Sequence, residues 1–401
     1  MHNKISGLTV LLLIIAVTSA VSQDQWPTKA WLTSTPQGVG LHADSLAFLD
    51  KELAGGKYGY IDGMLIIRHG KVAYEKSYKH DYASIYKEES KRKSPLNPND
   101  PTGPYNYFNP WWHPYIHDSR LHTLQSVTKT ITSIIIGTAL ARNEFPDLNT
   151  PALNYFDTAF IKNIDSRKRK ITIRHLLTMT AGFDWHENLP YSDPNNSGMI
   201  MEESFDWVQY VMDRPMADDP GTVFNYNSGA TQILAHIFRV ATGSDIEEYA
   251  VKHLFQPLGI TNYYWKRTPS GLIDTEGGLY LEKSDLAKIF YLYLKQGEWE
   301  GEKIVDPEWV KQSVTPFITV APGVSYGYKW WLYTYGSTSS GNVWAGNGFG
   351  GQMPIIIPEY DIVVVFTGWN ILPNKPFLGR RFVLEKVLRS IVEYNYEGKY
   401  K

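Results

Sequence analysis

The alternation of hydrophobic and polar positions predicts strands near both ends of the chain and helices between them. Close to the N-terminus, residues 41–54 have an amphipathic helical period, and two alternating runs that meet at His69-Gly70 indicate a β-hairpin. After Tyr326, short apolar runs separated by Gly, Pro and Asn indicate further strands, and residues 377–394 form a closing amphipathic helix. The predicted strands are 58–67, 72–78, 328–333, 343–345, 353–357 and 362–366.

The middle of the chain has mostly helical periodicity. A Ser244–Glu247 capping box, Ser284 and Asp306-Pro307 mark three helix starts. The predicted helices are 124–145, 171–183, 205–212, one that follows Ser228 and ends at 238, 244–255, 285–294 and a short one from 306. This order predicts an α+β fold with an antiparallel sheet formed from both chain termini and flanked by helices. A mostly helical region, approximately residues 130–315, is inserted in that sheet domain.

The first 22 residues have the three parts of a secretory signal peptide. Lys4 supplies the positive charge, residues 5–17 form an apolar stretch, and Thr18-Ser19-Ala20 offers a small-residue cleavage site. The apolar stretch is too short for a spanning helix, although an uncleaved N-terminal anchor is the alternative. We therefore expect residues 23–401 to form an exported domain, periplasmic or secreted, with no stable membrane anchor after cleavage.

Composition excludes several classes of chemistry. The 401 residues are 43% apolar and contain no cysteine, so a large core is expected and disulfides, thiolate metal sites and a cysteine nucleophile are excluded. The net charge is −2 and the basic residues are scattered, which does not indicate nucleic-acid binding. A long irregular stretch, residues 79–119, and the residues just after it hold His113, His117 and His122 beside tryptophans. Their spacing fits no metal site, so we expect aromatic packing and no metal or cofactor.

The tetrad Ser126-Val127-Thr128-Lys129 opens the helix predicted at 124–145. Side chains three apart lie on one helix face, so the Ser126 hydroxyl and the Lys129 amine can share a hydrogen bond. The free N–H groups of the first turn add positive partial charge, and a desolvated lysine with a lowered pKa would make the serine nucleophilic. Two further Ser-x-x-Lys matches, at Ser84 and Ser90, lie in a charged segment that indicates solvated surface.

A second serine motif, Gly323-Val324-Ser325-Tyr326-Gly327, matches the G-x-S-x-G elbow of α/β-hydrolases. That motif needs a helix after the serine and an acid and a histidine further along the chain. The last histidine is His253, before Ser325, and the residues after Ser325 indicate strand. The sequence therefore argues against an α/β-hydrolase.

Several further motifs follow the tetrad in a fixed order. They are HLLTMTAGF from His175, Phe224-Asn225-Tyr226-Asn227-Ser228, Pro257-Leu258-Gly259-Ile260, GGLYLEKSDLAK from Gly277, YGYKWW from Tyr326 and GNGFGGQ from Gly346. With them, residues 63–368 resemble the serine β-lactamase and penicillin-binding-protein superfamily, in its class C-like branch. That branch includes esterases, D-aminopeptidases and 6-aminohexanoate-oligomer hydrolases.

The resemblance implies roles for individual residues. Ser126 would be the acylated nucleophile, and Lys129 and Tyr226 would together take its proton and later pass it to the leaving group. The backbone N–H groups of Ser126 and Phe349 would hold the oxyanion, with Gly348 and Gly350 allowing the substrate to approach closely. The acidic, loop-rich segment 183–220 is expected to wall the substrate groove.

Two departures from the family pattern bear on the substrate. Ser228 stands where asparagine is common, and its hydroxyl can still donate a hydrogen bond. Gly348 stands where Lys or His would pair with a substrate carboxylate, so that charge-assisted contact is lost. The sequence thus favours an exported serine hydrolase acting through an acyl-enzyme on a small ester or amide, on the esterase and aminohexanoate-oligomer hydrolase side. A β-lactamase or D,D-peptidase and a non-catalytic ligand-binding protein are the alternatives.

Overall fold

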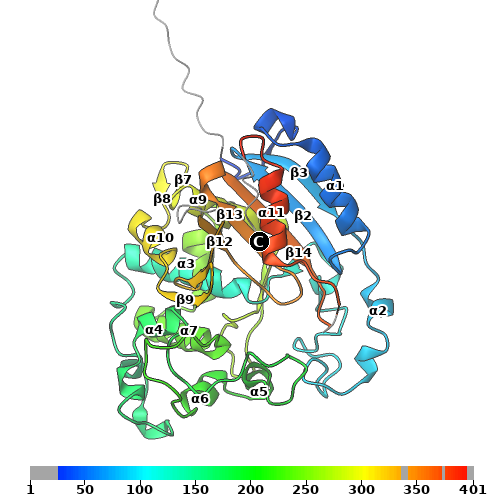
Figure 1. Ribbon diagram of the computed structural model, residues 1–401. Helices are drawn as coiled ribbons and strands as arrows, with labels where there is room; N and C mark the ends of the chain where they lie inside the picture. Colours follow the sequence, from blue (N-terminus) through cyan, green and yellow to red (C-terminus); the bar gives the residue numbers. More distant parts are fainter. Residues whose placement is uncertain (1–25, 336–341, 373–374, 395–401) are drawn as a thin grey trace, which may run out of the picture.

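The computed structural model describes residues 26–335, 342–372 and 375–394 (Figure 1). The predicted signal peptide and its cleavage site lie outside the described residues. Within the described part, no helix is both long enough and apolar enough to cross a membrane.

A nine-stranded sheet joins the two ends of the chain, in the order β1-β3-β2-β14-β13-β12-β11-β10-β9 (Figure 1). Its strands are β1 Leu32–Thr33, β2 Ile61–Arg68, β3 Lys71–Ser77, β9 Ile318–Ala321, β10 Val324–Tyr326, β11 Trp331–Thr334, β12 Asn342–Ala345, β13 Met353–Ile357 and β14 Ile362–Gly368. Every pairing is antiparallel except that of the short β1 with β3. In the middle, β2 pairs with β14, with Ile66 opposite Val364. The predicted antiparallel sheet built from both termini is confirmed.

Strand β2 is buried along its whole length because helices cover both faces of the sheet. Met64 and Ile66 pack toward α1 (Ala43–Ala54) and α11 (Arg380–Arg389). Leu65 and Ile67 point the opposite way, into the larger core that includes α9 (Lys283–Leu294). Successive strand residues face opposite sides of a sheet, so a continuous apolar run is what a doubly covered strand requires.

The remaining helices lie mostly below and behind the sheet in Figure 1. They are α2 Tyr82–Ile85, α3 Val127–Ala141, α4 Ile173–Leu177, α5 Ser197–Glu203, α6 Trp207–Met212, α7 Ser228–Thr242, α8 Ile246–Ala250 with a π-helical extension Val251–Phe255, and α10 Pro307–Ser313. Two small sheets are added: β4 His122–Thr123 with β6 Leu279–Leu281 and β5 Tyr264–Trp265, and the pair β7 Glu298–Trp299 and β8 Glu302–Lys303.

Several predicted boundaries differ from the structure. Asp245, not Ser244, caps α8, and α9 begins at Lys283 after Glu282, one residue before the predicted cap Ser284. The strand predicted from residue 328 begins only at Trp331, because Lys329 has a φ of 64° and its N–H donates to the Leu177 carbonyl. A residue in the left-handed region interrupts an extended strand.

The long connection 79–119 packs through its aromatic rings. His113 lies between Tyr107 and Trp369, with ring centroids 5.2 and 4.7 Å away. His117 lies against two tryptophans, and His122 contacts the Asp62 carboxylate at 3.0 Å. Among the described residues, no group of three His, Cys, Asp or Glu side chains could hold a metal ion. The histidines therefore serve packing and pairing in this structure.

Candidate active site

Ser126 lies at the N-terminus of α3, where the buried helix fixes the start of the tetrad. Ser126 is the N-cap residue, and Lys129, one turn on, donates from Nζ to Ser126 Oγ at 2.8 Å. The helix itself is held in the core because its residues 127–139 are all buried. The hydroxyl and the amine therefore meet as the three-residue spacing predicts.

The Lys129 ammonium has two further acceptors, both from Glu276. Its Nζ is 2.7 Å from the Glu276 carbonyl oxygen and 2.9 Å from the Glu276 carboxylate oxygen Oε2. An ammonium has three donors, and all three are used here. Burial acts to lower the pKa of Lys129, but its interactions with Tyr226 and Glu276 outweigh burial and raise that pKa. The lowered lysine pKa considered from the sequence is therefore wrong. Nothing in the sequence indicated that the Glu276 carboxylate would contact Lys129.

Tyr226 lies beside the other two groups, just before α7. The Lys129 Nζ is 5.3 Å from the centroid of its ring, which also stacks on Trp331 at 6.0 Å. Burial raises the pKa of the Tyr226 phenol, while the Lys129 ammonium and a hydrogen bond with Ser126 act to lower it. Because the net shift is upward, Tyr226 is a neutral phenol at neutral pH and can donate a proton.

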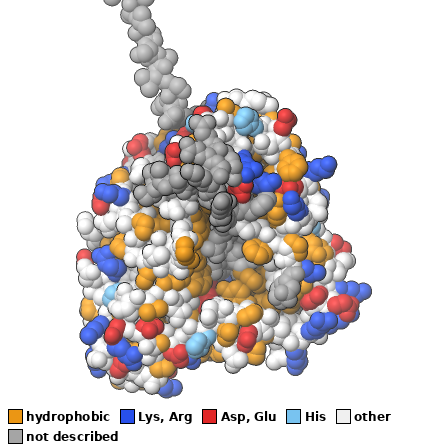
Figure 2. All heavy atoms as spheres, viewed as in Figure 1, with side chains coloured by type: hydrophobic (Ala, Val, Ile, Leu, Met, Phe, Trp, Pro, Cys, Tyr) orange, Lys and Arg blue, Asp and Glu red, His pale blue; other side chains and the backbone are white. Residues whose placement is uncertain are grey.

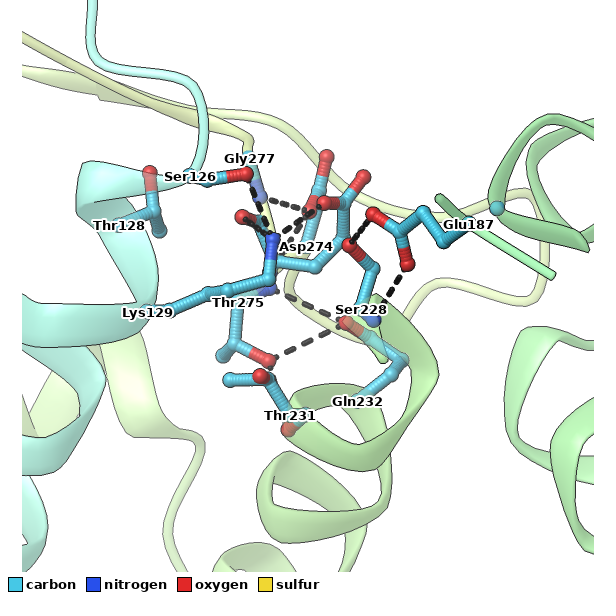
Figure 3. Close-up of polar contacts among 12 residues, drawn as sticks. Ser126, Thr128, Lys129, Glu187, Ser228, Thr231, Gln232, Asp274, Thr275 and Gly277 are labelled. Carbon is cyan, nitrogen blue, oxygen red and sulfur yellow. Dashed lines mark hydrogen bonds and ion pairs between the residues drawn. The ribbon is translucent and has the colours of Figure 1, made fainter. Parts of the chain in front are cut away.

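Ser228 has a different partner from the one expected. Its hydroxyl donates to Glu187 Oε1 at 2.6 Å, and its backbone N–H donates to Glu187 Oε2 at 2.7 Å (Figure 3). Glu187 also accepts from Trp185 and Tyr191. A serine has one hydroxyl proton, so this contact replaces the predicted hydrogen bond from Ser228 to substrate. Ser228 therefore stabilises the start of α7 through its two hydrogen bonds to Glu187.

The glycine-rich turn that was predicted to hold the oxyanion lies directly against the tetrad. Gly348 donates to the Gln352 carbonyl at 2.8 Å, and the buried Gln352 side chain donates to the carbonyl of Phe349 at 3.1 Å. Gly350 has a φ of +87°, which glycine adopts without strain. Within the described residues, the backbone N–H groups of Ser126 and Phe349 have no hydrogen-bond acceptor. Both N–H groups are thus available to a substrate oxygen.

Gly348 has no room for a side chain. A Cβ at this position would lie 2.4 Å from the Leu124 carbonyl oxygen and 2.8 Å from the Gln352 Cβ. The lysine or histidine expected here in penicillin-recognising proteins would displace the chain immediately before Ser126.

Gly348→Ala is expected to destabilise the fold by about 1–3 kcal/mol, the typical cost of overpacking a buried site. The expected result is a lower Tm in thermal unfolding and weaker ester hydrolysis. Gly379→Ala is the matched control, since a Cβ there would meet its nearest atom at an ordinary 3.7 Å. A Gly348→Ala protein with the Tm of the parent would contradict the described packing.

A small polar cavity of about 20 Å³ adjoins Ser126. That volume suits one water molecule. Its walls are Tyr107, Gln125, Ser126, Glu187, Tyr191, Gly198, Met199, Glu202, Ser228, Glu276 and Phe349. Part of the acidic segment 183–220 does line the site, but the sequence did not single out the three glutamates. In the sequence, two of these glutamates were marked only by the acidic composition of the 183–220 segment. The third was marked only by its position directly before Gly277-Gly278.

Other features predicted or excluded from the sequence lie away from this cavity. A larger cavity of about 580 Å³ is lined by residues of β3, the 110–122 segment and the start of α9, and none of the predicted site residues lines it.

The serine of the G-x-S-x-G match, Ser325, lies in β10, which pairs with β9 and β11. Ser90 is exposed and donates to the Lys87 carbonyl. On the face drawn in Figure 2, described charges of both signs are scattered among hydrophobic side chains.

Comparisons with known proteins identify relatives of this sequence and of its fold. Monacolin J acid methylbutanoyltransferase of Aspergillus terreus is 30% identical over 155 residues, which cover 36% of this chain and 37% of that protein. A solved structure described provisionally as a 6-aminohexanoate-dimer hydrolase of Bacillus anthracis has a TM-score of 0.63 at 20% identity, over 84% of this chain and 80% of that one. EstCE1, a hydrolase with promiscuous acyltransferase activity, has a TM-score of 0.63 at 16% identity, over 88% and 98%.

The sequence match to the acyltransferase thus spans about a third of either protein, and the two solved structures show the shared fold. The Beta-lactamase family model, in contrast, matches residues 61–381, which include the sheet strands β2 to β14 and the whole helical region between them. This chain belongs to the Beta-lactamase family.

Proposed function

We propose that the protein is an exported serine hydrolase that cleaves ester or amide bonds through an acyl-enzyme on Ser126. The observation that carries the proposal is the contact of Lys129 Nζ with Ser126 Oγ at 2.8 Å, with the Tyr226 ring 5.3 Å from the same nitrogen. A nucleophile, a base and a proton donor at one point are what acyl transfer needs. Export rests on the predicted signal peptide, and N-terminal sequencing of the exported protein is expected to begin at Gln23.

The proposed reaction begins with attack of Ser126 Oγ on the substrate carbonyl carbon. The serine proton passes toward Lys129, and the new oxyanion is held by the N–H groups of Ser126 and Phe349, each typically worth about 3 kcal/mol. Tyr226 then donates its proton to the leaving group and recovers one from Lys129. Water enters in the second half of the reaction and releases the acid by the reverse sequence of proton transfers.

The lack of space for a side chain at Gly348 favours ester and amide substrates that have no essential carboxylate. The described structure has no side chain, and no space for one, at the position that pairs with the carboxylate of penicillins in the family pattern. Loss of such a charge-assisted contact weakens binding of those substrates more than that of a neutral ester.

A fluorophosphonate probe tests the proposal directly. We expect one covalent adduct per chain, mapped by peptide mass spectrometry to Ser126, and faster turnover of short-chain p-nitrophenyl esters than of a chromogenic cephalosporin. An adduct on another residue would overturn the assignment of the nucleophile. Faster cephalosporin turnover would favour the β-lactamase alternative, and ligand binding without any turnover would favour a binding protein.

Transfer of the acyl group to an alcohol is a second candidate activity. It is favoured by the match to a methylbutanoyltransferase and by the fold shared with a hydrolase of promiscuous acyltransferase activity. The acyl-enzyme is common to both outcomes, and the acceptor decides between them. Adding an alcohol to the ester assay is expected to yield the new ester as well as the acid if transfer occurs; acid as the sole product would exclude it.

A further inference from the structure

Behind Lys129, Glu276 and Glu202 both line the small cavity beside Ser126. Glu202 Oε1 accepts the Tyr107 hydroxyl at 2.7 Å, but no N–H or O–H of the described residues reaches its buried Oε2. The Glu276 carboxyl acts on Glu202 through its charge. Two carboxylates that line one cavity away from water repel each other, so the pair is stabilised when one of them holds a proton.

The surroundings decide which glutamate holds that proton. Burial and the charge of Glu276 raise the pKa of Glu202 well above its usual value. Burial also acts to raise the pKa of Glu276, but the Lys129 ammonium and the hydrogen bond from Glu202 outweigh it, so that pKa is lowered. When the pair holds one proton, that proton therefore lies on Glu202, and Glu276 is ionised.

Glu276 is the one carboxylate, among the described residues, in ion-pair contact with Lys129. Other titratable groups act on it from several elements. They are Tyr105, Tyr107, Tyr191, Glu202, Tyr226, Lys266 and Asp274. Of these, Asp274 and Lys266 have pKa values that burial shifts to about 7 and about 8.

We propose that Glu276 is a positioning and proton-holding residue that takes a proton from Lys129 so that Lys129 can act as a base toward Ser126, and that Glu202 orients the Glu276 carboxyl toward Lys129. This rests on the proposed acyl-enzyme at Ser126. A fully protonated ammonium has no lone pair, so Lys129 cannot accept the serine proton until it has lost one of its own. Glu276 Oε2, at 2.9 Å, is placed to receive it.

The proton balance closes over one acylation. Lys129 gives a proton to Glu276, and the free amine takes the Ser126 proton as the bond from Oγ to the acyl carbon forms. When the tetrahedral intermediate collapses, the leaving group takes the Tyr226 proton and Tyr226 is restored by Lys129. Glu276 then returns its proton to Lys129, so the serine proton has moved to the leaving group and every other group is as it began.

Glu276→Gln tests the proton-holding step. The amide keeps the shape of the side chain but cannot accept the proton, so kcat/KM for a p-nitrophenyl ester is expected to fall by about 10²-fold at neutral pH, within the range of acid–base contributions. Without the carboxylate, burial lowers the pKa of Lys129, and the lost activity is expected to return as pH rises and the amine loses its proton to solvent. Glu282→Gln, at the start of α9 and outside the small cavity beside Ser126, is the matched control.

Glu202 provides a second, independent test. Glu202→Gln still offers an N–H to Glu276 and is expected to keep activity within about threefold. Glu202→Leu leaves Lys129 as the donor to the Glu276 carboxylate, so the pKa of Glu276 rises and the acidic limb of the pH profile shifts toward neutrality. In an Asp274→Asn protein, where Asp274 gives no acid band, infrared spectroscopy at neutral pH should show a protonated carboxylic acid. That band should disappear when Glu202→Gln is added and persist when Glu203→Gln, a change in the exposed neighbour on α5, is added. The pH profile of Asp274→Asn shows how much Asp274 contributes to the acidic limb.

Two results would overturn the proposal: a Glu276→Gln enzyme with the parent's activity and pH profile, or an Asp274→Asn protein whose protonated acid survives the addition of Glu202→Gln. If Glu276→Gln does not fold, the infrared comparison still decides. Failure of the acyl-enzyme assignment looks different, because the parent would then give no fluorophosphonate adduct on Ser126. With the assignment correct and the inference wrong, the parent and Glu276→Gln would label at equal rates at every pH.

Discussion

Ser126→Ala is expected to lower kcat/KM for ester hydrolysis by about 10⁴-fold or more and to abolish the fluorophosphonate adduct. Removal of a covalent nucleophile leaves only the catalysis due to binding and the oxyanion donors. Within the described site, Ser126 is the hydroxyl that the Lys129 amine contacts, at 2.8 Å. The side chain lost is small and lies at a helix N-cap without a capping hydrogen bond, so the fold should be retained. Both activity and labelling are measured on protein with the Tm of the parent.

Two serine variants serve as matched controls. Ser90 belongs to another Ser-x-x-Lys tetrad but is exposed on a short 3₁₀-helix, and Ser325 belongs to the G-x-S-x-G match but lies in β10. Ser90→Ala and Ser325→Ala are expected to keep labelling and turnover near those of the parent. Labelling that persists in Ser126→Ala, or vanishes in Ser325→Ala, would refute the choice of Ser126.

Tyr226→Phe is expected to lower kcat by about 10²–10³-fold on an alkyl ester or an amide. The phenylalanine ring can keep its stacking on Trp331 and its contact with Lys129, so the change removes little besides the proton donor. A p-nitrophenolate leaving group departs without protonation, so the loss on a p-nitrophenyl ester should be much smaller. The ratio of the two losses is the measurement that assigns the proton to the leaving group.

Tyr263→Phe, a half-buried tyrosine that packs against Phe255 away from the site, controls for loss of a phenol hydroxyl elsewhere. An equal loss on both leaving groups in Tyr226→Phe would mean that the phenol acts on attack by Ser126 and not on departure. Unchanged kcat on both substrates would remove Tyr226 from the mechanism.

The sheet was predictable because its strands have the apolar runs that doubly covered strands need. Both β2 and β14 are buried at every residue, and their sequences are almost continuously apolar. The turn at Lys329 was missed because contacts distant in sequence hold a bulky residue at positive φ: its N–H donates to the Leu177 carbonyl, and its carbonyl accepts from the Thr130 hydroxyl. The predicted start of α8 differs from the observed one because Asp245, the residue after the predicted cap Ser244, caps the helix.

The site was predictable where its residues are neighbours in sequence and not where they meet through the fold. Ser126 and Lys129 lie on one helix turn, so their contact follows from helix geometry. Glu276 and Glu187 reach the site from separate loops, and nothing local marks an acid that will face a lysine or a serine. The wrong expectation for the Lys129 pKa has the same origin, because pKa depends on these distant charges.

The pairing of β2 with β14 has a consequence for how the protein is made. Residues 69–361 lie between these two central strands, so the sheet cannot close until nearly the whole polypeptide has left the ribosome. Contacts so distant along the chain form slowly, and until then the apolar edge of β2 needs protection from aggregation. We therefore expect nascent chains that stop before Ile362 to depend on chaperones and to be sensitive to proteases, and release of the finished chain to be the step that permits folding.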